Sequence, residues 1–125
     1  MPSGSDVMLA RMAHRKASSS IDPNDTILAA IVERIVGRFH PEQIILFGSR
    51  ARGTAHRESD VDLLVVMPFA GSRLKVAVEI RKALRGLGVA KDIVVMTPEE
   101  FAARKEIPGT LAYPAFHEGR ILHAA

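Results

Sequence analysis

Residues 43–67 read QIILFGSRARGTAHRESDVDLLVVM and contain two apolar runs on either side of a polar stretch. The first run, residues 43–47, is rich in side chains that favour strands and stops at Gly48, so it predicts a short strand buried on both faces. The second run, residues 61–67, predicts another strand for the same reason. The connection between them, residues 48–59, predicts a polar loop with a short helical turn.

Helical patterns flank these two strands. Residues 23–39 space their apolar side chains with helical period, and the preceding Asp22 with Pro23 suits a helix start. Residues 73–85 alternate an apolar stripe with a polar one and are followed by Gly86 and Gly88, which predict the end of a helix. Residues 91–96 predict the third strand.

The C-terminal part predicts two further helices and a last strand. Thr97 can cap a helix that starts at the next residue, and Pro108 predicts the start of another helix that runs to about His117. Residues 120–123 predict a small terminal strand. This order of elements predicts one α+β or α/β domain with a small mixed sheet.

Composition limits both the organisation and the chemistry of the chain. Residues 1–20 are rich in serine and basic groups and predict a flexible tail, with a short amphipathic helix over residues 7–15 as the alternative. Residues 21–125 then form one domain. The absence of cysteine excludes disulfides and thiolate metal sites, so a bound metal would be held mainly by oxygen.

Charge and hydropathy indicate a cytoplasmic protein. The net charge of +3 mildly favours an anionic partner. No apolar run approaches the roughly 20 residues that span a bilayer, so we expect no membrane contact.

Three aspartates stand at the predicted entrances of strands, where this residue type is depleted: Asp60, Asp62 and Asp92. Alternation along a strand places Asp60 and Asp62 on one face, with Cα atoms roughly 6.6 Å apart. If the first two strands pair antiparallel, Gly48 and Ser49 face these acids. A right-handed crossover to the third strand then brings Asp92 to the same end of the sheet.

Each of these acids alone would be read as a solvated turn residue, but three at one end of a sheet indicate a cation site. Hard oxygen ligands select Mg²⁺ or Mn²⁺, and two such ions about 3.5 to 4 Å apart can clamp both oxygens of a phosphoryl transfer. Backbone N–H groups after Gly48 and the Ser49 hydroxyl can hold phosphates. Arg50 and Arg52 add positive charge, although they also fit a solvated basic loop. The constellation predicts transfer of a nucleotide from a triphosphate.

The stretch GSRARGTAHRESDVDLLVV, residues 48–66, resembles the signature of the DNA polymerase β-like nucleotidyltransferases, which is Gly-Ser, ten residues, then Asp-x-Asp. In particular, the chain is similar to the minimal nucleotidyltransferase (MNT) domains encoded beside HEPN ribonuclease toxins. The resemblance covers about residues 23–123 and includes Asp92 as the third acid. It implies an α+β fold of the polymerase β-like type, with a small mixed β-sheet flanked by helices.

The resemblance also implies roles for the residues of the motif. Asp60 and Asp62 would hold two Mg²⁺ ions, while Asp92 would complete one of the two sites and assist deprotonation of an acceptor hydroxyl. Gly48 and Ser49 would bind the terminal phosphates of the nucleotide.

The expected function is Mg²⁺-dependent transfer of AMP from ATP to a hydroxyl of a partner protein, a HEPN toxin that the reaction neutralises. A protein acceptor is favoured because little chain remains outside the catalytic core to bind a small acceptor. One alternative is a small-molecule transferase of aminoglycoside type, assembled as a homo-oligomer. Another is an antitoxin that acts by binding alone. Nucleic acid is not an expected partner.

Overall fold

The computed structural model describes residues 23–48, 61–88 and 91–125. Its elements, in chain order, are α2 (Pro23–Phe39), β1 (Gln43–Phe47), β2 (Val61–Val66), α4 (Arg73–Ala83), β3 (Lys91–Met96), α5 (Pro98–Arg104), α6 (Ala112–Glu118) and β4 (Arg120–Ala124). The strands of this part of the chain form one four-stranded mixed sheet in the order β3-β2-β1-β4. This architecture confirms the predicted α+β class.

The pairing within the sheet follows the predicted topology. β1 and β2 are antiparallel, whereas β2 and β3 are parallel and are connected through α4. β4 returns along the other edge of β1 in antiparallel orientation, with a register shift between Ile44 and Ile45. The C-terminal end of β1 and the N-terminal ends of β2 and β3 therefore lie at the same end of the sheet.

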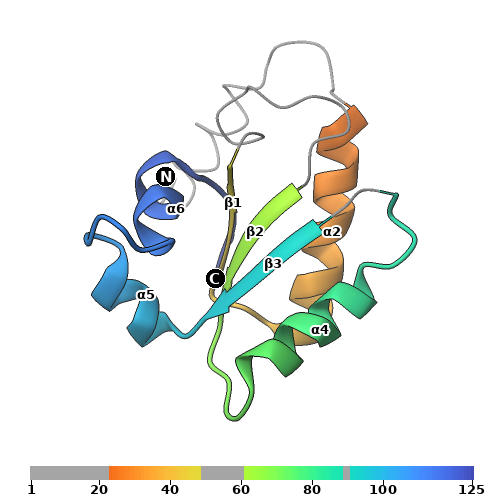
Figure 1. Cartoon of the computed structure of the whole chain (residues 1–125). Coiled ribbons are helices and arrows are strands. Elements are labelled where there is room, and N and C mark those ends of the chain that lie inside the picture. Colours follow the sequence, from red (N-terminus) through yellow and green to blue (C-terminus); the bar gives the residue numbers. More distant parts are fainter. Residues whose placement is uncertain (1–22, 49–60, 89–90) are drawn as a thin grey trace, which may run out of the picture.

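The sheet is the middle layer of three, with α2 and α4 on one face and α5 and α6 on the other (Figure 1). Alternate residues of each strand face the two helical layers, which is why β2 is apolar along most of its length. The larger cluster joins α2 and α4 to residues such as Leu63 and Val65, whereas the smaller joins α5 and α6 to Leu64 and Val66. Two cores thus hold the central strand in place.

Most element ends match the sequence, but the second of the two C-terminal helices starts later than predicted. α2 has the predicted bounds, whereas α6 begins at Ala112 and the prediction of a helix start at Pro108 was wrong. Gly109 follows that proline with φ +95°, a left-handed conformation that interrupts a helix. The Thr110 hydroxyl then donates to the carbonyl oxygens of Arg104 and Ile107, at 2.9 and 2.8 Å. These bonds close a turn where a helix was expected.

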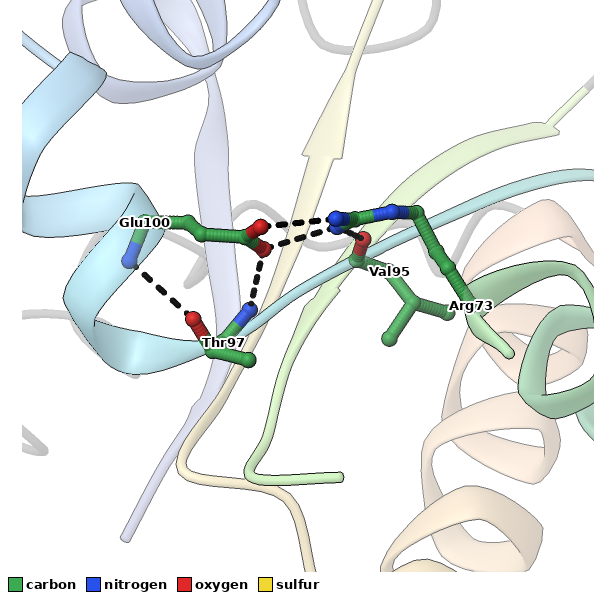
Figure 2. Close-up of polar contacts among 4 residues, drawn as sticks. All are labelled: Arg73, Val95, Thr97 and Glu100. Atoms are coloured by element: carbon green, nitrogen blue, oxygen red, sulfur yellow. Dashed lines mark hydrogen bonds and ion pairs between the residues drawn. The ribbon is translucent and has the colours of Figure 1, made fainter. Parts of the chain in front are cut away.

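An ion pair joins α4 to the start of α5, as Figure 2 shows. Arg73 donates to both carboxylate oxygens of Glu100, at 2.7 and 2.6 Å, and to the carbonyl oxygen of Val95 at 3.0 Å. Glu100 also accepts from the backbone N–H of Thr97, whose hydroxyl accepts from the Glu100 N–H and completes a capping box. The bonds from Arg73 and then from Thr97 lower the pKa of Glu100 to about 2. This junction lies beyond the C-terminal end of β3, at the opposite end of the sheet from the predicted site.

A second arginine fixes the other end of α4. Nη1 of Arg34, on α2, donates to the carbonyl oxygens of Ala83 and Arg85 at 3.2 and 3.0 Å. Ala83 is the last residue of α4 and Arg85 follows its C-cap, so the arginine lies at the C-terminal end of the helix, where a positive charge interacts favourably with the helix dipole. The C-terminal turn of α4 is thereby attached to α2. No helix within the described ranges is both long and apolar enough to cross a membrane.

Candidate active site

The predicted site lies where β1 ends and β2 and β3 begin. Asp62 is the second residue of β2 and Asp92 the second residue of β3. The parallel register pairs these two residues directly, and the antiparallel register places Asp62 opposite Phe47, the last residue of β1. Two of the three predicted acids thus meet on neighbouring strands, with Cα atoms separated by about 4.8 Å, the usual spacing between strands.

The two acids share the face of the sheet that α5 and α6 cover farther along. On this face Asp62 is followed by Leu64, which belongs to the smaller apolar cluster, and Asp92 is followed by Val94, which packs against that cluster. Asp62 is half-buried, whereas the Asp92 side chain is 66% exposed. The face therefore changes from apolar to acidic at the end of the sheet, and Asp92 is the acid more open to an incoming molecule.

Gly48 provides the close approach that brings the first strand against the acids. Its φ of +80° is a left-handed conformation that favours glycine. A Cβ atom on this residue would collide with Oδ2 of Asp62 and lie 3.2 Å from its Cγ. The carboxylate of Asp62 therefore occupies the space that a side chain at position 48 would need. This contact gives a physical reason for glycine at the start of the Gly-Ser pair.

The remaining predicted site residues lie outside the described residues: Asp60, Ser49, Arg50 and Arg52. Their roles stay predictions, and so does the assignment of residues 1–20 as a tail. Among the described residues, no group of three or more His, Asp or Glu side chains could hold a metal ion. Two of the three proposed ligands fall within these ranges.

The structure adds a residue that the sequence did not single out. Arg81, in the last turn of α4, places Nη2 4.0 Å from Oδ1 of Asp92. The signal available in the sequence was weak, since a basic residue near the end of a helix is common and favourable for its dipole. Only the packing of α4 against β3 shows that this arginine reaches an acid of the candidate site.

The residues present fit a divalent cation. Asp62 and Asp92 offer hard oxygen ligands side by side, the donor type that Mg²⁺ and Mn²⁺ prefer. Gly48 lets the end of the first strand lie directly against the Asp62 carboxylate, which a side chain at position 48 would displace. Two neighbouring carboxylates also repel each other, and a cation between them relieves that repulsion. The geometry suits a reaction on a phosphorylated, metal-bound substrate.

Comparison with known proteins identifies the class of protein. The family model described as a nucleotidyltransferase domain matches residues 27–118. The protein adenylyltransferase MntA of Thermococcus cleftensis is 31% identical over 98 residues, which cover 78% of this chain and 98% of the relative. The chain belongs to the nucleotidyltransferase domain family, and it is a nucleotidyltransferase of the minimal nucleotidyltransferase (MNT) type.

Two solved structures share the fold. One, described as a toxin-antitoxin with AMP-PNP, has a TM-score of 0.51 and 23% identity, with 77% of this chain and 73% of that chain covered. The other, a putative nucleotidyltransferase from Sulfolobus solfataricus, has a TM-score of 0.52 and 24% identity, with 77% and 76% covered. These likenesses confirm the predicted nucleotidyltransferase fold.

Proposed function

We propose that this nucleotidyltransferase moves AMP from ATP to a hydroxyl group of a partner protein in a Mg²⁺-dependent reaction. We further propose that the partner is a HEPN ribonuclease toxin, which the modification neutralises. The observation that carries the proposal is the pairing of Asp62 with Asp92 beside Gly48, at one end of the sheet of a nucleotidyltransferase domain.

The proposed roles divide the site into a cation-binding part and a phosphate-binding part. Asp60 and Asp62 would hold two Mg²⁺ ions, and Asp92 would complete one of these sites. Bound in this way, the ions would neutralise triphosphate charge and stabilise the attacking and leaving oxygens. Gly48 and Ser49 would hold the terminal phosphates through backbone N–H groups and a hydroxyl. Arg50 and Arg52 would add positive charge near those phosphates.

The proposed transfer breaks the phosphoanhydride bond between the α- and β-phosphates of ATP and forms a phosphodiester bond between AMP and the acceptor. The acceptor hydroxyl oxygen forms a bond to the α-phosphorus of ATP, while the bond from that phosphorus to the oxygen bridging to the β-phosphate breaks. Pyrophosphate leaves with the bond electrons, and the hydroxyl proton passes to Asp92. The 66% exposure of the Asp92 side chain supports this role, because an acceptor on another protein must approach from solvent.

A protein acceptor is supported by the relative that matches over nearly its whole length. MntA of Thermococcus cleftensis is named a protein adenylyltransferase, and 98% of it is covered. The solved toxin-antitoxin structure with AMP-PNP supports a toxin as the acceptor and an adenine nucleotide as the donor. Together they favour transfer to a protein over transfer to a small molecule.

Intact-mass spectrometry tests the proposal with a HEPN protein from a neighbouring gene. Incubation with ATP and Mg²⁺ should add one or more adenylyl groups to that partner, and the added mass should persist after the two proteins are separated. The double substitution Asp60→Asn with Asp62→Asn should abolish the adduct and the protection of cells, while Glu99→Gln, an acid-to-amide change on α5, should leave both intact. Full protection by the double variant, without any adduct from the parent protein, would show that neutralisation occurs by binding alone.

A further inference from the structure

We propose that Arg81 regulates the metal site by competing with the divalent cation for the carboxylate of Asp92. This inference rests on the proposed metal-dependent transfer and concerns the same site. Nη2 of Arg81 lies 4.0 Å from Oδ1 of Asp92, and the two side chains are 51% and 66% exposed. The pair is therefore close enough to attract and open enough to separate.

The backbone beneath Arg81 is held firmly relative to the acids. Ala83, the last residue of α4, is buried, and Leu84, its C-cap, is buried in the larger apolar cluster. Arg34 attaches the same turn to α2 through the carbonyl oxygens of Ala83 and Arg85. The start of the Arg81 side chain is thus fixed near β3, whereas its exposed guanidinium can change partners without any movement of the helix.

Charge explains why the two partners of Asp92 exclude each other. In the metal-free site, Asp62 and Asp92 are adjacent like charges, and the guanidinium offsets part of their repulsion. A divalent cation would bind the same carboxylate, whose Oδ1 atom is the one near Arg81, and it would repel a guanidinium at ion-pair distance. Arg81 must therefore leave Asp92 before the cation can bind with full strength.

This competition couples metal binding to nucleotide binding. In the absence of nucleotide, Arg81 weakens the affinity of the site for the cation. A triphosphate is an anion that gives the displaced guanidinium a new partner, so the loss of the contact with Asp92 no longer weakens the binding of the cation. Because coupling between two ligands is reciprocal, the site would retain its cation chiefly when nucleotide is present.

Removal of Arg81 should strengthen metal binding to the free protein. An exposed ion pair of this kind has a modest strength, so Arg81→Gln should lower the Mn²⁺ concentration at half-saturation by up to about fivefold. Arg81→Lys keeps the charge and should stay near the parent value. Lys82→Gln is the matched control, because it removes the same charge from the next residue, which pairs with Glu79 at 3.6 Å instead of an acid of the site.

A titration of the whole 125-residue chain with Mn²⁺ measures these affinities directly. In nuclear magnetic resonance spectra, backbone amide signals near Asp62 and Asp92 should lose intensity as the paramagnetic ion binds, and Arg81→Gln should reach half-loss at a lower concentration than the other proteins. If the parent binds Mn²⁺ but Arg81→Gln and Lys82→Gln have equal midpoints, the role of Arg81 is overturned and the metal site stands. If no variant binds Mn²⁺, the metal site fails, and both proposals fail with it.

Thermal unfolding separates competition from a structural role of Arg81. Competition predicts that Mg²⁺ raises the melting temperature of Arg81→Gln more than that of the parent or of Lys82→Gln. A merely structural arginine would lower the melting temperature by the same amount with and without Mg²⁺, and that result would contradict the proposal.

Discussion

Asp62 is the residue on which the proposed site depends most, because three structural relations meet there. It is paired with Asp92 on one side, lies opposite the last residue of β1 on the other, and fills the space beside Gly48. The sequence alone was sufficient to predict that Asp62 and Asp92 share an end of the sheet, because strand order and crossover handedness determine it. The contact with Gly48 required coordinates, since it depends on a left-handed backbone conformation and on close packing.

Asp62→Asn should abolish transfer without unfolding the protein. The substitution removes one of two adjacent like charges, so the metal-free protein should be equally stable or more stable by up to about 1 kcal/mol. Mg²⁺ should raise the melting temperature of the parent more than that of the variant, because binding to the native state stabilises it. Thermal unfolding with and without Mg²⁺, beside an adenylyl-transfer assay, measures both effects. A variant that no longer folds would instead make Asp62 a structural residue.

Gly48→Ala should reduce both activity and stability. The left-handed φ should cost about 1 to 2 kcal/mol, and the new methyl group should push the Asp62 carboxylate away, with a loss of activity on the order of 100-fold. Gly71→Ala is the matched control, because Gly71 has φ +85° but a Cβ atom there would meet nothing within 4 Å. Chemical denaturation and transfer assays on both variants test this. Equal activity losses would mean that the approach to Asp62 is irrelevant.

At the scale of elements, local signals predicted most of the helices and strands. α2 and α5 have the expected starts because a proline in the first turn and, for α5, a capping threonine act within a few residues. α4 ends at Ala83, two residues earlier than expected, and the chain then turns through Gly86 and Gly88, both with positive φ. The late start of α6 was missed because Pro108 suits both a helix start and a turn. The positive φ of Gly109 is compatible with the turn and not with a helix.

The junction of α4 and α5 should make stability depend on pH through Glu100. Its pKa in the folded protein is about 2, below its ordinary value of 4.5, chiefly because Arg73 donates hydrogen bonds to it. Because the pKa is lower in the folded protein, the ionised carboxylate stabilises the folded state at every pH above the ordinary pKa of 4.5. That contribution is lost as the pH falls from about 5 toward 2. Acid-induced unfolding should reflect this loss.

Glu100→Gln isolates this contribution. It should lower the melting temperature by a few degrees at pH 7, and the difference from the parent should shrink as the pH approaches 2, where Glu100 itself becomes protonated. Glu99→Gln, in the same first turn of α5, controls for the loss of a negative charge near a helix start. Melting curves between pH 2 and 7 check the result. A difference that does not vary with pH would show that the Arg73 ion pair is not its source.

At the scale of the whole molecule, the three-layer architecture explains how a small domain presents charged groups at one end. The two apolar clusters hold β2 from both faces, so its first residues can carry acids without loss of the core. This arrangement was predictable because hydropathy period and topology are encoded in the chain. The meeting of Arg81 with Asp92 was not, because it depends on how α4 packs against the edge strand β3.

ATP binding should therefore be stronger in the presence of a divalent cation, although the chain as a whole has a net charge of +3. The site presents Asp62 and Asp92, and the proposed third acid Asp60, toward a polyanionic substrate, so local repulsion outweighs the weak attraction of the overall charge. Coupling between ligands is commonly about 5- to 150-fold, and we expect Mg²⁺ to strengthen ATP binding within that range.

Isothermal titration calorimetry with a non-hydrolysable ATP analogue, in Mg²⁺ and in EDTA, measures the ratio of the two nucleotide affinities. In Asp62→Asn the ratio should fall toward one, because fewer acids then repel the nucleotide and fewer hold the cation. Equal affinity of the parent protein in both buffers would contradict the assignment of these acids to a metal site.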